Sequence, residues 1–197
     1  MKLRSLIVAL AVSFAAAALH APLHAQTGLY LNPLAMRISN SVADHGTFAF
    51  LGQNSTSQMF WGPQFGAYYD FKTPYAFKAG LDLRDSIMHG SGAELNNFLV
   101  GLRISGKPFK RPFKPYLEPM VGVGTSRAPF TAIRVSKGEY GVYAGIDYET
   151  HHHVDFRLVE VGYSSLITAS SETIGGSDII PSADIFSVGT GLIFRFP

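Results

Sequence analysis

From residue 26 onward, the chain alternates apolar residues with polar or small ones at a period of two. In residues 139–148, one parity holds only tyrosine, valine, alanine and isoleucine, whereas the other holds glycine, Glu139, Tyr143 and Asp147. Because successive side chains of a β-strand point to opposite faces, this pattern predicts strands whose two faces meet different surroundings. We predict eight strands, at residues 28–38, 58–71, 75–85, 94–105, 115–125, 138–149, 153–166 and 183–196.

The lengths of these segments favour a membrane barrel. Strands in soluble proteins commonly have about 5–6 residues, whereas a tilted membrane-spanning strand needs roughly 9–11. The connections at 39–57, 86–93, 126–137 and 167–182 are long and mostly polar, and those at 72–74 and 149–152 are short. Long loops at one end and short turns at the other are typical of closed antiparallel barrels. The fold class predicted is therefore all-β, an eight-stranded antiparallel transmembrane β-barrel with both termini at the short-turn end.

Two features interrupt the alternation. In residues 153–166 the apolar parity changes, and a β-bulge near Leu158–Val159 would restore it. Pro33, Pro63 and Pro119 fall inside predicted strands. Because proline cannot donate a ladder hydrogen bond, we expect bulges or missing bonds at these three positions.

An outward-facing apolar parity places charged residues and glycines inside the barrel. An apolar outer wall of this area is stable in contact with lipid but not in contact with water. An eight-stranded barrel is just wide enough for side chains to fill it, so the charges should pair across the lumen, with glycines making room for arginine and tyrosine. A narrow ion-conducting pore is the alternative. The predicted interior network has six basic and six acidic members: Arg37, Asp70, Lys78, Asp82, Arg84, Arg103, Glu118, Asp147, Asp155, Arg157, Glu160 and Arg195.

The first 25 residues differ from the rest. A basic start at Lys2 and Arg4 precedes a nearly continuous apolar run from Leu6 to Leu19, and Ala25 suits a cleavage site. We predict a cleaved signal peptide at 1–25 and a barrel domain at 26–197. The alternative, an anchoring helix, needs roughly 20 apolar residues. Loss of the two basic residues would leave 14 Lys and Arg against 14 Asp and Glu, so a nucleic-acid partner is not expected.

The last strand carries a recognisable pattern. Residues 189–197 read GTGLIFRFP, in which Leu192, Phe194 and Phe196 alternate toward the terminus, although Pro197 replaces the usual final aromatic residue. This resembles the signal that outer-membrane barrels present to the barrel-assembly machinery. The whole of 26–197 resembles small bacterial outer-membrane barrels of the OmpA, OmpX and opacity-protein type, and HHHVDFRLVEVGY resembles stretches of acidobacterial barrels.

The resemblance implies a location in the bacterial outer membrane. It implies contact with outer-membrane lipid, and with the assembly machinery and periplasmic chaperones during biogenesis. We expect no peptidoglycan-binding domain after the eighth strand. The chain contains no cysteine, so an exported barrel of this kind has no disulfide framework.

Two clusters could carry chemistry at the short-turn end. Residues 151–153 are three consecutive histidines, which suit a turn, but only Glu149 and Asp155 are nearby to complete a ligand set. We therefore expect neither a metal nor a cofactor. A basic turn could contact phospholipid headgroups or a periplasmic partner, or simply be solvated. Its members are Lys107, Lys110, Arg111 and Lys114.

At the long-loop end, Asp44, His45 and His89 lie on predicted loops with Ser41 and Ser91 nearby. Lipid A deacylases and palmitoyltransferases use histidine, serine and an acid near this rim, but nothing in the sequence assembles a triad. The leading prediction is a non-enzymatic outer-membrane barrel with a structural or adhesion-like surface role and an unidentified surface ligand. The alternatives are a lipid A-modifying enzyme and a small pore.

Overall fold

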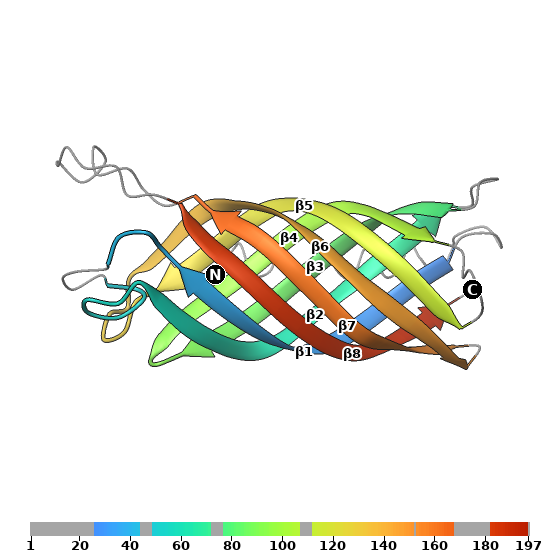
Figure 1. Cartoon of the computed structure of the whole chain (residues 1–197), viewed down its shortest axis with the longest axis horizontal. Helices are drawn as coiled ribbons and strands as arrows, with labels where there is room; N and C mark the ends of the chain where they lie inside the picture. The colour runs from blue at the N-terminus through green and yellow to red at the C-terminus, as the bar shows by residue number, and fades with distance from the viewer. Residues whose placement is uncertain are drawn as a thin grey trace.

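The alternating segments form eight antiparallel strands in the computed structural model (Figure 1). It describes residues 26–43, 49–71, 77–106, 112–151, 153–167 and 182–196, so the predicted signal peptide lies outside the described residues. The strand count and fold class predicted from the sequence are confirmed. The strands are β1 (Gln26–Ser39), β2 (Ser57–Phe71), β3 (Phe77–Gly90), β4 (Ala93–Gly106), β5 (Phe113–Arg127), β6 (Arg134–His151), β7 (Val154–Leu166) and β8 (Ala183–Phe196).

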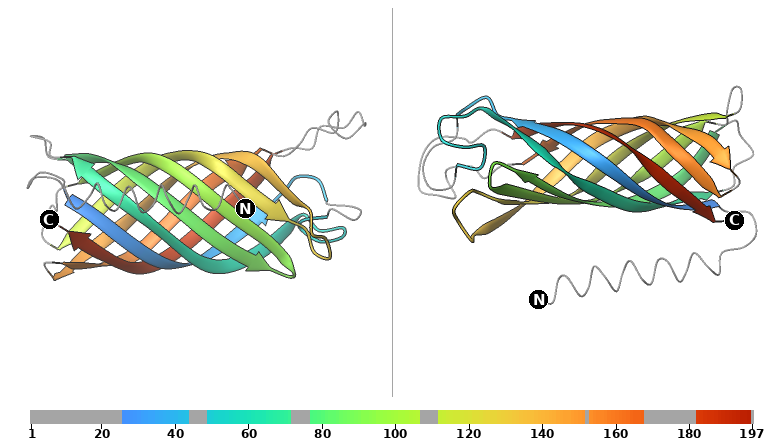
Figure 2. Two further views of the ribbon diagram at one scale, coloured as in Figure 1. Left: turned by 180° about the vertical axis from the view of Figure 1, so that it is seen from behind. Right: turned by 90° about the horizontal axis from the view of Figure 1, so that it is seen from below.

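The strands close into a barrel. Each strand pairs with the next one along the chain, and β8 returns to pair with β1. In that closing pair, Leu29 lies opposite Phe194 and Leu31 lies opposite Leu192. The start of β1 and the end of β8 lie at the same end of the barrel (Figures 1 and 2). None of the described residues forms a helix long and apolar enough to cross a membrane.

The barrel is taller at the loop end than we predicted. The predicted loop at 86–93 is mostly strand, and β3 and β4 meet in a two-residue turn at Ser91 and Gly92. Both residues have positive φ, 45° and 84°, as the type I′ hairpin turn requires. Strands β5 and β6 likewise extend to Arg127 and Arg134, which leaves only 128–133 as their loop. The barrel wall therefore extends beyond the predicted membrane-spanning segments at the loop end, and we call this extension the collar.

The bulge predicted in β7 is present. Ile146 of β6 pairs with Val159 and Asp147 pairs with Arg157, so Leu158 is the extra residue. The same irregularity disturbs the pairing of β7 with β8. Leu158 and Val159 consequently both lie on the outer wall. The extra residue of this bulge is therefore the cause of the change of parity along the strand, as predicted.

Each of the three prolines lies at a gap in a ladder, as predicted. Pairing between β1 and β8 stops at Leu31 and resumes at Leu34, which leaves out Pro33. Pairing between β2 and β3 leaves out Pro63, and pairing between β4 and β5 leaves out Pro119. Each proline remains paired with the strand on its other side, where the ladder does not need a backbone N–H from that position.

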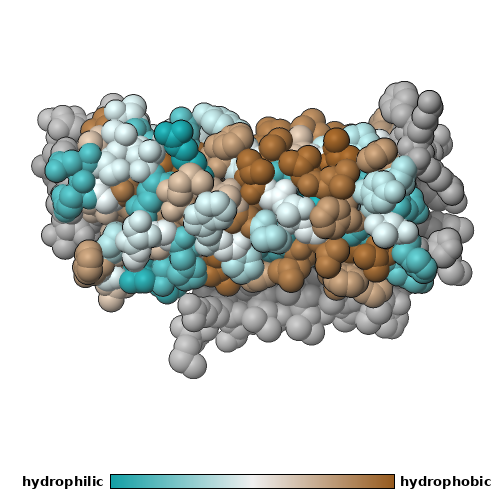
Figure 3. Space-filling model, turned by 60° about the horizontal axis from the view of Figure 1, so that its bottom comes forward, coloured by the Kyte–Doolittle hydropathy of each residue, from teal (hydrophilic) through white to brown (hydrophobic). Residues whose placement is uncertain are grey.

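The outer wall carries an apolar belt between two rings of aromatic side chains. Figure 3 shows apolar side chains gathered toward the end where β1 begins, and a more hydrophilic surface toward the loops. Phe71, at the terminal end of β2, and Trp61 are ten residues apart. At about 3.3 Å per residue and a tilt of about 40°, they are about 25 Å apart in height, the usual height of the lipid-facing band. The loop-side ring consists of Trp61, Tyr140, Tyr163 and Phe186, and the terminal ring includes Phe71, Phe77, Phe113 and Phe196.

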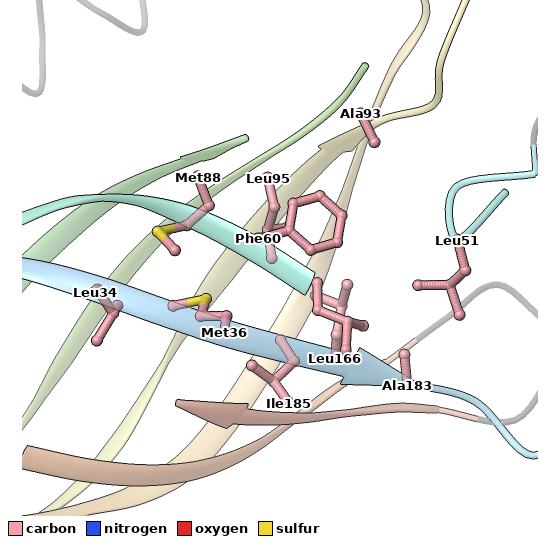
Figure 4. Close-up of a cluster of buried hydrophobic side chains, with 11 residues drawn as sticks. Leu34, Met36, Leu51, Phe60, Met88, Ala93, Leu95, Leu166, Ala183 and Ile185 are labelled. Atoms are coloured by element: carbon pink, nitrogen blue, oxygen red, sulfur yellow. The ribbon is translucent and has the colours of Figure 1, made fainter. Parts of the chain in front are cut away.

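Beyond the loop-side ring, the barrel is filled by apolar side chains (Figure 4). Phe60, Met88 and Leu95 are completely buried there, and Phe50 of the first loop stacks on Phe60 with ring centroids 5.2 Å apart. We call this cluster the apolar plug. Its members are Leu34, Met36, Ile38, Leu51, Phe60, Met88, Ala93, Leu95, Leu166, Ala183 and Ile185.

One predicted member of the interior network, Arg37, does not lie in the lumen. In β1 the even-numbered residues face the lumen, so Met36 and Ile38 are buried and Arg37 is exposed on the outer wall. The rule that charges face inward has one exception on the described strands between the aromatic rings, Asp85, which shares the outward parity of Leu81 and Leu83 in β3, and it fails beyond the loop-side ring. Water surrounds the collar there, so its apolar side chains face inward, as they do in a soluble protein.

Candidate functional site

The lumen between the aromatic rings contains a continuous network of ion pairs. Glu118 accepts hydrogen bonds from Arg84 and from Arg103. Arg103 also binds Asp147 at 2.8 Å, and Arg157 binds the same carboxylate at 3.0 Å through its Nε. All five side chains are almost completely buried. Because buried charges are costly unless they are paired, this mutual arrangement is what makes a charged interior stable.

Three further carboxylates complete the centre of the network. Glu160 bridges Arg84 at 3.1 Å and Arg157 at 2.8 Å. Asp82 lies 3.4 Å from Arg84 Nε. Asp70 lies 3.8 Å from Arg103 Nε. The eight residues come from β2 to β7, so the network ties six strands together across the lumen.

Four tyrosines pack among these arginines. The guanidinium of Arg103 lies between the rings of Tyr68 and Tyr116, 4.3 and 4.1 Å from their centroids. That of Arg157 lies 4.6 Å from both Tyr30 and Tyr116. Such stacking satisfies the faces of a planar cation whose edges are already hydrogen-bonded. It also fills the lumen, as a barrel of this width requires.

Each of these tyrosines faces a glycine on the neighbouring strand. Tyr116 is opposite Gly145, and a methyl group added to that glycine would overlap the phenol ring. The same relation joins Tyr30 to Gly66, Tyr68 to Gly28 and Tyr143 to Gly162. The expectation that glycines make room for large lumen side chains is confirmed.

A second charged layer lies at the terminal end of the lumen. Lys114 binds Asp155 at 3.1 Å and Glu149 at 3.2 Å. Arg195 binds Asp155 at 3.0 Å and Glu149 at 3.3 Å. Lys78 donates a hydrogen bond to Gln26 at 2.8 Å. The structure thus places eleven of the twelve predicted network residues in or at the ends of the lumen, and Arg37 on the outer wall.

Lys114, a possible headgroup contact in the predicted basic turn, lies in β5 and pairs with carboxylates at the terminal end of the lumen. Its side chain faces the barrel base and is engaged by two carboxylates. Lys107, Lys110 and Arg111 lie outside the described residues. The alternation of β5 explains the difference, because Lys114 has the same parity as the inward-facing Glu118.

A polar belt that the sequence analysis missed separates the ion pairs from the plug. Glu139 accepts hydrogen bonds from Ser164 at 2.8 Å and from Asn97 at 3.3 Å. No charged side chain pairs with it in the described part of the chain. Its position was visible in the sequence, since Glu139 shares the parity of Asp147, but it fell at the edge of the predicted strand.

The outer face of the collar carries its own small ion cluster. Glu94 binds Arg127 at 2.6 Å and Arg134 at 3.2 Å, and His89 lies 3.9 Å away. This cluster lies beyond the loop-side aromatic ring, outside the membrane. The hydrogen bond from the Arg127 guanidinium holds the pKa of Glu94 below its usual range. A cavity of about 500 Å³ beside it is lined by Trp61, His89, Ser91, Glu94 and Arg127, among others.

The other predicted clusters are only partly described. Asp44, His45 and His152 lie outside the described residues. His153 Nδ1 lies 3.3 Å from the carbonyl oxygen of Arg195, and the carbonyl oxygen of His151 accepts a hydrogen bond from Arg195 Nη2 at 2.7 Å. Among the described residues, no group of three or more histidine, cysteine or acidic side chains could hold a metal ion.

A closed eight-stranded barrel with ion pairs inside and an apolar belt outside defines a class: the chain is a small transmembrane β-barrel of the outer-membrane type. The particular solved structures that it resembles belong to that class. Neisserial surface protein A matches with a TM-score of 0.57 and 12% identity, over 86% of this chain and 97% of that one. Ail, the attachment invasion locus protein of Yersinia pestis, matches with a TM-score of 0.50 and 11% identity, over 88% and 100%. No protein-family model and no curated protein matches the chain.

Proposed function

We propose that this protein is a non-enzymatic barrel of the bacterial outer membrane whose loop end mediates surface interactions. The observation that carries the proposal is Phe130, at the tip of the loop between β5 and β6. Its side chain is fully exposed and its backbone has a positive φ of 61°. A bulky residue rarely adopts this conformation, and strain of this kind is concentrated at binding sites.

Phe130 belongs to a group of exposed apolar side chains at the loop end. Val42, Ile133 and Ile167 are each more than half exposed. This end lies beyond the loop-side aromatic ring, so these residues meet water and not lipid. Apolar side chains presented to water on loops are typical of a surface that binds a partner.

The interior supports a rigid platform for these loops. The ion-pair network fills the lumen between the aromatic rings, and the apolar plug fills it above them. Leu51 and Phe50 join the first loop to the plug, so the packing reaches from the lumen into the loop layer. A filled interior favours a platform over the small pore, and a planar-bilayer recording without channel steps is the expected result.

An adhesion assay tests the proposal. Bacteria that display the barrel should adhere to immobilised host-cell matrix, and a variant with Phe130→Ser and Ile133→Ser should lose most of that adhesion. Ser136→Ala, an exposed change on the neighbouring strand, is the matched control and should adhere as the parent does. A shift of the unboiled band on a gel verifies that each variant is folded. Undiminished adhesion by the folded double variant would refute the proposal.

A second candidate, a lipid A-modifying enzyme, is favoured by the cavity beside the collar. It brings His89, Glu94 and Ser91 together next to Trp61 of the aromatic ring. Mass spectrometry of lipid A from cells with and without the protein, and with His89→Ala, tests this candidate. A lipid A change that depends on His89 would replace the adhesion proposal.

We further propose that the outward residues of β8 form the assembly signal for the barrel-assembly machinery, with periplasmic chaperones acting earlier. Leu192, Phe194 and Phe196 each expose nearly half of their side chain on the wall, in one line along the last strand. In the folded barrel these side chains meet lipid, so their alternation is available for recognition only before insertion.

A further inference from the structure

The lipid-facing wall is hollowed at one place. A groove of about 740 Å³ lies across β7, β8, β1 and β2. Almost every group lining it is apolar. The hydroxyl of Thr190 is the exception, and it donates a hydrogen bond to the carbonyl oxygen of Arg157 at 2.7 Å. Six of the lining residues are Pro33, Ala35, Trp61, Pro63, Leu158 and Val188.

The groove results from the irregularities of the strands around it. Pro33 and Pro63 lie opposite each other on β1 and β2, and each interrupts the ladder on its other side. The bulge at Leu158 disturbs the third neighbouring pair. Three interruptions in adjacent strands thus leave a depression where regular strands would present a continuous row of side chains.

The groove lies at a defined depth. Ala35 pairs with Trp61 of the loop-side aromatic ring, and Leu31 and Pro33 follow on the same face toward the centre of the belt. It therefore faces the hydrocarbon of the leaflet on the loop side. A group that occupies the groove must therefore be apolar. The membrane supplies such groups as lipid acyl chains.

Arg37 provides the charge at the upper end of the groove. It is the next outward residue after Ala35 and lies just beyond the aromatic ring, between Met59 of β2 and Phe186 of β8. Among the described residues, no carboxylate lies within ion-pair distance of it. Lipid phosphates occupy this level, and a guanidinium binds phosphate with two parallel hydrogen bonds.

We propose that the groove and Arg37 form a binding site for one anionic phospholipid-type molecule of the loop-side leaflet, with an acyl chain in the groove and its phosphate on Arg37. The site rests on the membrane orientation of the barrel and not on any activity of the loops. Because surrounding lipid is equally apolar, the hydrophobic effect does not select the occupant. Selectivity comes from the dispersion contacts of a chain that fills the void and from the charge at its upper end.

Trp61 makes the site directly observable, because it is the only tryptophan of the chain. The folded barrel is placed in phosphatidylcholine vesicles that contain increasing fractions of phosphatidylglycerol with brominated acyl chains. Bromine quenches tryptophan fluorescence on contact. A specific site predicts quenching that saturates at a low fraction of the brominated lipid, whereas random contact predicts a small loss proportional to that fraction.

Two variants separate the parts of the site. Arg37→Gln should weaken the apparent affinity roughly tenfold, the effect of losing one charged hydrogen-bonded contact. Val188→Phe fills the groove and should abolish saturation. Two controls should behave as the parent: Arg134→Gln, which removes an arginine elsewhere on the collar, and Val121→Phe, which adds the same ring to the outward face of β5.

The outcomes distinguish the site from the membrane assignment. Linear quenching, equal for brominated phosphatidylglycerol and phosphatidylcholine and equal in all variants, would overturn the lipid site while leaving the barrel in the membrane. Saturation that survives both Arg37→Gln and Val188→Phe would place the lipid elsewhere and also overturn it. No quenching by any brominated lipid would show that Trp61 does not face hydrocarbon, and the orientation itself would be wrong.

Discussion

Two substitutions on opposite sides of one ion pair should have unequal effects on stability. Arg103→Met should destabilise the barrel more than Glu118→Gln, although each removes one partner of the same contact. Arg103 binds Glu118 and Asp147, and its guanidinium lies between the rings of Tyr68 and Tyr116. Methionine leaves two buried carboxylates without this partner and two aromatic faces without their cation.

The charge balance of the network sets the direction of the inequality. The central cluster holds three arginines and five carboxylates, a formal charge of −2. Glu118→Gln reduces this to −1, and each arginine keeps another carboxylate within about 3 Å. Arg103→Met increases it to −3. Breaking a buried pair costs about 3–5 kcal/mol, and a weakened charged hydrogen bond about 1.5–3 kcal/mol. We therefore expect a difference of about 2 kcal/mol in the free energy of unfolding.

Reversible urea unfolding in detergent or lipid vesicles measures this difference. Fluorescence of Trp61 reports the transition, and the gel shift on boiling provides a second probe. Leu102→Met is the matched control, because Leu102 precedes Arg103 on the outer face and is more than half exposed. It should change stability little. If Glu118→Gln proves as destabilising as Arg103→Met, or more so, the carboxylate excess does not govern the network and the reasoning is refuted.

Three further predictions concern the tyrosine packing, the collar and biogenesis. Gly145→Ala should cost about 1–3 kcal/mol of unfolding free energy, because the added methyl overlaps the ring of Tyr116; an unchanged urea midpoint would contradict this. Glu94 should titrate below an ordinary glutamate in a carbon-detected NMR experiment, so its pairing stabilises the collar at neutral pH and is lost as the pH falls through that lowered pKa. Arg127→Ala should return the pKa toward normal, and an unmoved titration would exclude the pairing. Phe196→Ser should reduce the amount of folded barrel in outer-membrane fractions, whereas refolding of the purified chain in detergent should change little; equal levels in cells would exclude a role for Phe196 as an assembly signal.

Much of the fold follows from patterns that are local in the sequence. Period-two alternation predicted all eight strands, since a strand between lipid and a polar lumen must alternate wherever it crosses the membrane. The change of parity at Leu158–Val159 predicted the bulge because an extra residue is the least disruptive way to reverse a strand's faces. The gaps at Pro33, Pro63 and Pro119 followed from the missing donor alone.

The errors arose where the surroundings change along a single strand. In β1, apolar residues occupy both parities from Leu34 to Ile38, so alternation could not show which face holds Arg37. Only the register between β1 and β2, in which Tyr30 lies opposite Gly66 and Gly28 lies opposite Tyr68, fixes the even positions as lumenal. Lys114 was misplaced because a basic run suggested a solvated turn, whereas the strand already begins at Phe113.

The two interiors of this barrel together determine how deeply it lies in the membrane. Between the aromatic rings, lipid surrounds the wall, and the fold is held by ladder hydrogen bonds and by the buried ion pairs. Beyond the ring of Trp61, water surrounds the wall, and burial of the plug provides the hydrophobic stabilisation that a lipid-facing wall cannot. Moving the barrel outward would expose the apolar belt to water. Moving it inward would carry Glu94 and Arg127 into hydrocarbon. The boundary between these regions is the level at which Arg37 emerges, which is why a charge on the outer wall is tolerated there and can serve to hold a lipid phosphate.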